Sequence, residues 1–158
     1  MVAFAFAALA CGASGARAQL PTERVVLLGL AGEPSLAPRL ALAVRALAGA
    51  LGPRASVVTM EADGCWPEEP ACTARYLRGT GATRLVFVRV VWERAGCVPM
   101  RGRDGTLTGH RMLRAPTLHI GVLDAHGASL AHESDIVNDL AHVASRALEL
   151  ATSAGLLR

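Results

Sequence analysis

Two short runs of Val and Leu constrain this fold more than any other feature of the sequence. Residues 24–30 and 84–92 are dominated by branched apolar side chains, and each run is too short for a buried helix, so each predicts a buried strand. Between them, apolar residues recur at helical spacing from Leu36 to Leu51, with Ser35 placed to cap the helix and Gly52-Pro53 to end it. Strands that alternate with such helices build a parallel sheet.

Further elements extend this pattern into a single α/β domain. The sequence predicts a short strand at 56–60, a helix from Pro70 to Leu77 ended by Gly79 and Gly81, a strand at 114–124, a short strand at 129–132, and a last helix that begins at 134 or 138 and ends at 154. That helix would bury one stripe: Val137, Leu140, Ala144, Ala147 and Ala151. The predicted fold is therefore a mixed sheet of about five strands with three helices, in the order β-α-β-α-β-β-β-α.

The chain has 158 residues, enough for one compact domain, which we place at residues 24–155. Its 16 basic residues are all Arg, against 13 acidic residues, and the formal charge is +3. So small an excess is no nucleic-acid footprint by itself.

The N-terminus is typical of a secretory signal peptide. A short apolar run is followed by the small-x-small site Ala16-Arg17-Ala18, although no basic residue precedes the run. We expect cleavage after Ala18, a linker at 19–23 and a periplasmic or secreted protein without a transmembrane span. A strand or helix of the domain, a membrane anchor, and a lipoprotein attached through Cys11 are the alternatives.

The mature chain would keep Cys65, Cys72 and Cys97. The first two flank the stiff segment Trp66-Pro67-Glu68-Glu69-Pro70, which can hold them within disulfide range in an oxidising compartment. We expect the Cys65–Cys72 disulfide, with three unpaired thiols as the alternative. No Cys-x-x-Cys occurs, so neither a zinc ribbon nor thioredoxin-like chemistry is indicated.

No catalytic motif stands out, and we assign no catalytic residue, cofactor or metal. Residues 29–34 lack the spacing of a phosphate loop, the serines lack a nucleophile elbow, and Cys97 with His110 has no local signature. One alternative is a small metal-dependent hydrolase that uses the C-terminal His and acidic residues, and another is a ligand-binding module at the strand ends. The cluster comprises Asp124, His126, His132, Glu133, Asp135, Asp139 and His142.

The most basic stretch lies between the two antiparallel strands. Residues 95–113 are rich in Gly, Arg, Thr and His around Asp104-Gly105, which predicts an exposed hairpin tip. Only Glu93 and Asp104 oppose its charge, and it lacks the aromatic residues of a single-strand nucleic-acid platform. We expect it to bind an envelope protein or an anionic envelope surface through five side chains: Arg94, Arg101, Arg103, Arg111 and Arg114.

Several helix-to-strand junctions carry a family resemblance. They are the strand at 24–30, the stretch Cys72-Thr73-Ala74-Arg75-Tyr76-Leu77 that leads through Gly81-Ala82-Thr83 into Leu85-Val86-Phe87-Val88, and Leu123-Asp124-Ala125-His126-Gly127. Over residues 24–150 the chain resembles the periplasmic α/β domain at the N-terminus of TolB and, more loosely, LpoB- and CsgG-type envelope proteins. The resemblance implies a non-catalytic accessory or interaction role in the cell envelope.

Export generates the first testable prediction. An Ala18→Leu change should block processing, because signal peptidase accepts only small side chains at that position. Mass spectrometry of the native protein should find Gln19 as its first residue and should find no such species for the variant. A native protein that keeps Met1 would contradict the signal-peptide interpretation.

Overall fold

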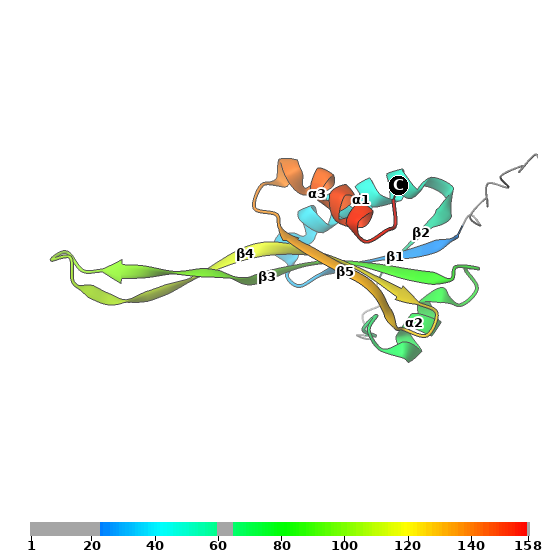
Figure 1. The fold of residues 1–158 in the computed structure, drawn as a ribbon, viewed down its shortest axis with the longest axis horizontal. Helices are drawn as coiled ribbons and strands as arrows, with labels where there is room; N and C mark the ends of the chain where they lie inside the picture. Colours follow the sequence, from blue (N-terminus) through cyan, green and yellow to red (C-terminus); the bar gives the residue numbers. More distant parts are fainter. Residues whose placement is uncertain (1–22, 60–64, 158) are drawn as a thin grey trace, which may run out of the picture.

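The computed structural model describes residues 23–59 and 65–157. The predicted signal peptide and nearly all of the linker lie outside these residues. The described chain forms one five-stranded mixed sheet in the order β2-β1-β3-β4-β5, with helices on both faces (Figure 1). The strands and longer helices are β1 (Val25–Ala31), α1 (Ala37–Leu51), β2 (Ala55–Thr59), α2 (Pro70–Leu77), β3 (Arg84–Arg101), β4 (Leu107–Asp124), β5 (Ser129–Ile136) and α3 (Val143–Ser153). The predicted fold class and order of elements are confirmed.

The parallel half of the sheet is buried on both faces. β1 pairs in parallel with β2 on one side and with β3 on the other. Val26, Leu27 and Leu28 have no exposed surface although their side chains alternate between the two faces. Helices must therefore cover both faces, and α1 with α3 lies on one face and α2 on the other (Figure 1).

The larger core lies between the sheet and the two helices α1 and α3. Val86, Val88 and Ile120 come from the sheet, and Leu47 and Ala147 from the helices, all with no exposed surface. The predicted stripe of α1 is buried at Leu36, Leu47 and Leu51 and half-buried at Leu40 and Val44.

The segment Pro34–Arg54 is long and apolar enough, by length and composition, to cross a membrane. It comprises α1 with a short 3-10 turn at each end. In the structure its apolar stripe packs against the sheet.

Three local predictions were wrong. Residues 95–113 are not mainly a loop, because β3 continues to Arg101, β4 begins at Leu107, and only the turn around Asp104-Gly105 separates them. The Ser35 side chain does not cap α1, which begins after a 3-10 turn at Pro34–Leu36. The last helix begins at Val143 rather than at 134 or 138, because β5 pairs with β4 as far as Ile136 and a 3-10 turn at Leu140–His142 follows. Leu140 lies in that turn and is therefore exposed.

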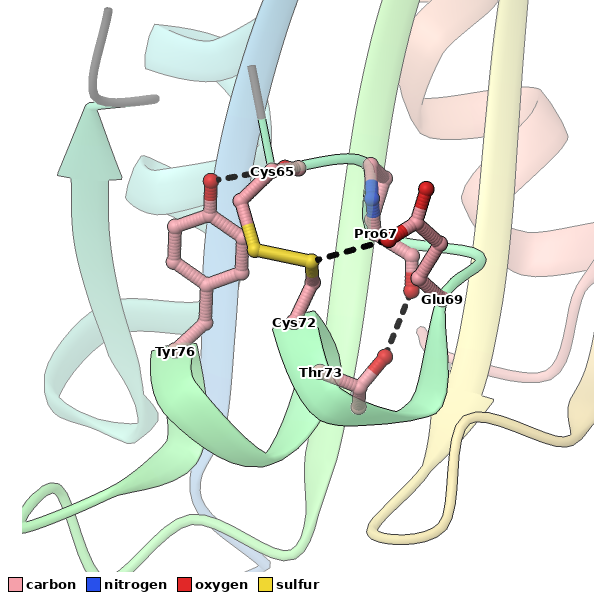
Figure 2. Close-up of a disulfide and its surroundings, with 6 residues drawn as sticks. All are labelled: Cys65, Pro67, Glu69, Cys72, Thr73 and Tyr76. Carbon is pink, nitrogen blue, oxygen red and sulfur yellow. Dashed lines mark hydrogen bonds between the residues drawn. A yellow bond between two sulfur atoms is a disulfide. The ribbon is translucent and has the colours of Figure 1, made fainter. Parts of the chain in front are cut away.

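Cys65 and Cys72 form the predicted disulfide, with their Cα atoms 5.5 Å apart. Two hydrogen bonds hold the same loop on α2 (Figure 2): the Tyr76 hydroxyl donates to the Cys65 carbonyl at 3.0 Å, and the buried Thr73 hydroxyl donates to the Pro67 carbonyl. Cys72 and Tyr76 also pack into the smaller core beneath the sheet. The disulfide therefore fixes the loop that precedes α2 to the helix itself.

Removing this disulfide should destabilise the domain. Closing a loop of this length contributes about 2 kcal/mol in the chain-entropy treatment, so a Cys65→Ala/Cys72→Ala double variant should unfold at a lower denaturant concentration than the parent. Cys97→Ala is the matched control, because Cys97 is free and exposed. Equal unfolding midpoints for the parent and the double variant would contradict a stabilising role.

Candidate functional site

The most prominent feature outside the two cores is a two-stranded ribbon that projects from the sheet (Figure 1). The pairing of β1 with β3 ends at Val90, and the pairing of β5 with β4 begins at Thr117. Beyond these points, among the strands that the structure describes, β3 and β4 pair only with each other. We call residues 93–114 the arm; each of its strands extends roughly 25–30 Å at the usual rise per residue.

The tip of the arm is a tightly bonded turn. Gly102 and Thr106 are joined by a backbone hydrogen bond of 2.8 Å, and Gly105 has a φ of +81°. The Thr106 hydroxyl and backbone N–H both donate to Asp104, and these bonds lower the pKa of Asp104. The predicted Asp-Gly turn is confirmed, and it sets the register of the strands next to the tip.

The five predicted arginines are all on the arm and all exposed. Arg101 donates to the Gly105 carbonyl at 2.9 Å. The side chains of Arg94, Arg103, Arg111 and Arg114 have neither a hydrogen bond nor an ion pair within residues 23–59 and 65–157. Arg94 lies directly opposite Arg114 on the neighbouring strand, and like charges in that position repel each other.

The arm also carries apolar side chains that nothing in the described structure covers. Five of the ten large hydrophobic residues that are exposed among the described residues belong to it: Val98, Met100, Leu107, Met112 and Leu113. A ribbon of two strands has no second layer against which to bury them. The arm therefore offers cations and apolar surface together.

Cys97 and His110, which have no local catalytic signature in the sequence, are not brought together by the fold. Cys97 lies opposite Met112, and His110 lies opposite Pro99. Neither side chain makes a contact with the other that would activate the thiol.

A second cluster, which the sequence patterns did not predict, lies at the base of the arm. Its members are Glu93 on β3, His119 on β4 and His132 on β5, which the register of the sheet places on the face that also carries α2. His119 Nδ1 lies 3.2 Å from His132 Nε2, and His119 Nε2 lies 3.1 Å from Glu93 Oε1.

Burial decides the charge of His119. Its side chain is 14% exposed, and this desolvation lowers the pKa of His119, although Glu93 opposes the shift. The shift favours the neutral form of the ring. Nε2 is within ion-pair distance of Glu93, but it lacks the alignment of a hydrogen bond and has no hydrogen-bond partner within the described chain.

The Phe87 ring packs near the ring of His132. The phenyl ring lies across Gly121, where a Cβ atom would overlap it, and its centroid is 6.0 Å from that of His132. Next to it on β3, Arg89 is held 5.6 Å over the Trp66 ring. Gly121 is thus the residue that lets an aromatic ring support the His132 side chain.

The C-terminal histidines and acids, which were the basis of the alternative metal-dependent hydrolase, do not converge. His126 lies in the β4–β5 turn, and Glu133 and His132 alternate on β5. Asp139 caps the 3-10 turn at Leu140–His142 by accepting a hydrogen bond from the Ala141 N–H, and it forms an ion pair with His142 at 3.3 Å. Within the residues that the structure describes, no three His, Cys, Asp or Glu side chains are grouped as metal ligands. Asp124 instead closes the turn by accepting hydrogen bonds from the backbone of His126 and Ala128.

Comparison with known proteins does not identify a family for this chain. No family model and no curated protein matches the chain. Among solved structures, a PelC dodecamer from Paraburkholderia phytofirmans is similar, with a TM-score of 0.44 and 14% sequence identity over 86% of this chain and 90% of that one. A likeness of this size carries no conclusion about function or assembly.

Filling the space at Gly121 should disturb the domain. In a Gly121→Ala variant the new methyl group would displace the buried Phe87 ring, so unfolding should cost about 1–3 kcal/mol less than in the parent. Gly49→Ala on α1 is the control, because nothing surrounds that position and alanine should stabilise the helix by about 0.5–1 kcal/mol. Denaturant titration measures both, and a Gly121→Ala variant as stable as the parent would contradict this packing.

Proposed function

We propose that this chain is an extracytoplasmic, non-catalytic interaction domain that binds an anionic protein partner of the cell envelope through the arm. The observation that carries the proposal is the arm itself, a ribbon outside the core with five exposed apolar side chains and four arginines that have no partner among the described residues. Interfaces are enriched in Arg and Met and bury apolar side chains at their centres.

Charge supports an anionic partner. The arm holds five Arg against Glu93 and Asp104, whereas the rest of the chain nearly balances. The repulsion between Arg94 and Arg114 is relieved when a carboxylate lies between them. Such a positive field speeds association with an acidic surface and weakens as salt increases.

The backbone of the arm supports a protein rather than a lipid partner. Along the arm no strand of the described part of the chain lies beside the outer edges of β3 and β4. Such edges can accept a strand of another protein, with side-chain pockets adding specificity. A bilayer surface offers the charge but no strand.

The proposed extracytoplasmic location is supported by the disulfide and by the predicted signal peptide. The disulfide between Cys65 and Cys72 is compatible with an extracytoplasmic location. The signal peptide stays a prediction from residues 1–18, and the resemblance to the N-terminal domain of TolB stays a prediction as well.

The test replaces Arg101, Arg103 and Arg111 together with Ser. Exposed changes of this kind usually alter stability by no more than about 0.5 kcal/mol each, so circular dichroism should show an unchanged fold. Crosslinking in an envelope extract should recover a partner with the parent at low salt, less at high salt, and little with the triple variant.

The matched control removes the same number of positive charges from residues outside the arm. Arg24, Arg45 and Arg78 are exposed and lie outside the arm, so their replacement with Ser should leave recovery of the partner nearly unchanged. Equal loss in both triple variants would indicate a general charge effect and contradict the proposal. Binding to vesicles of anionic lipid that equals binding to the extract would make a membrane the partner instead.

A further inference from the structure

The contact between His119 and His132 has the dimensions of a metal chelate. Imidazole nitrogens bind zinc at about 2.0–2.1 Å, so two of them on a tetrahedral ion lie about 3.3 Å apart. His119 Nδ1 and His132 Nε2 share a hydrogen bond of 3.2 Å, on adjacent strands whose register fixes both rings on one face. An ion bound by both nitrogens would replace the shared proton.

Glu93 lies where it favours the tautomer that such a site needs. A proton on His119 Nε2 would face the Glu93 carboxylate, whose Oε1 is 3.1 Å away, and would leave the lone pair of Nδ1 on the side of His132. A histidine that binds a metal almost always presents its other ring nitrogen to a carboxylate or carbonyl in this way. The opposite tautomer would place a bare nitrogen against a carboxylate.

The two rings are also held in place before any ion binds. His119 is largely buried, and His132 lies against the Phe87 ring, which is itself seated on Gly121. His132 remains exposed, so an ion would reach the pair from solvent and keep positions open for water or an added ligand.

We infer that His119 and His132 form a two-histidine site for a divalent transition-metal ion, with Glu93 orienting His119 from behind. Imidazole ligands suit copper, zinc and nickel and do not suit magnesium. The site lies at the base of the arm, shares only Glu93 with it and uses none of its arginines, so metal binding can be tested apart from partner binding.

Calorimetric titration with Cu²⁺, Zn²⁺ and Mg²⁺ tests the site. A Cys97→Ser background removes the free, exposed thiol as a competing ligand. This protein should bind one Cu²⁺ or one Zn²⁺ per chain, with Cu²⁺ the tighter, and no Mg²⁺. No binding of either transition metal, or equal binding of Mg²⁺, overturns the inference.

Three variants in that background locate the ion. His132→Gln, at an exposed position, should keep the fold and lose at least tenfold in affinity. Glu93→Gln should lose 10- to 100-fold, the usual effect of removing such a partner. His126→Gln is the matched control, because this exposed histidine lies in the nearby turn, and its affinity should not change. Binding that is undiminished in His132→Gln, or lost equally in His126→Gln, overturns the assignment.

Discussion

The parallel pairing of β1 with β3 is the constraint on which the rest of this structure depends. Both strands are buried on both faces along the segment where they pair, from Val26 to Leu28 and from Leu85 to Val88. A strand pair buried in this way folds only when helices cover it above and below. The positions of α1, α3 and α2 therefore follow from this pairing, and so does the need for the disulfide-bonded loop that holds the short α2 in place.

The same pairing decides where the arm begins. β1 ends at Ala31, opposite Val90, and from Glu93 onward β3 has only β4 beside it. No helix layer covers the arm, so its apolar side chains stay in water. This exposure costs free energy, which the packed core of the domain must offset. The bulges of the arm at Ala95 and Thr108 and its arginines also suppress indiscriminate strand pairing. A surface built in this way favours a specific, charged partner.

The face of the sheet that carries α2 shows how one glycine organises a cluster. Because Gly121 has no side chain, the Phe87 ring can cross β4 and pack near His132. The half of this face beyond α2 then holds His119, His132 and Glu93, which come from three different strands. The arm and the histidine pair meet at Glu93, the first residue of the arm, although they use different chemistry.

The sequence by itself determined the fold class, the order of the elements, the Asp104-Gly105 turn and the Cys65–Cys72 pair, because each depends on local spacing or on residues close together in the chain. The structure also extended β3 and β4 into the arm and β5 to Ile136, since strand ends are set by a neighbouring strand rather than by propensity. The histidine pair was beyond prediction for a related reason. Whether His119 meets His132 or Glu93 depends on register, and a shift of one residue would turn each side chain to the other face. Tertiary structure alone decided that contact, because only the packed core fixes the register.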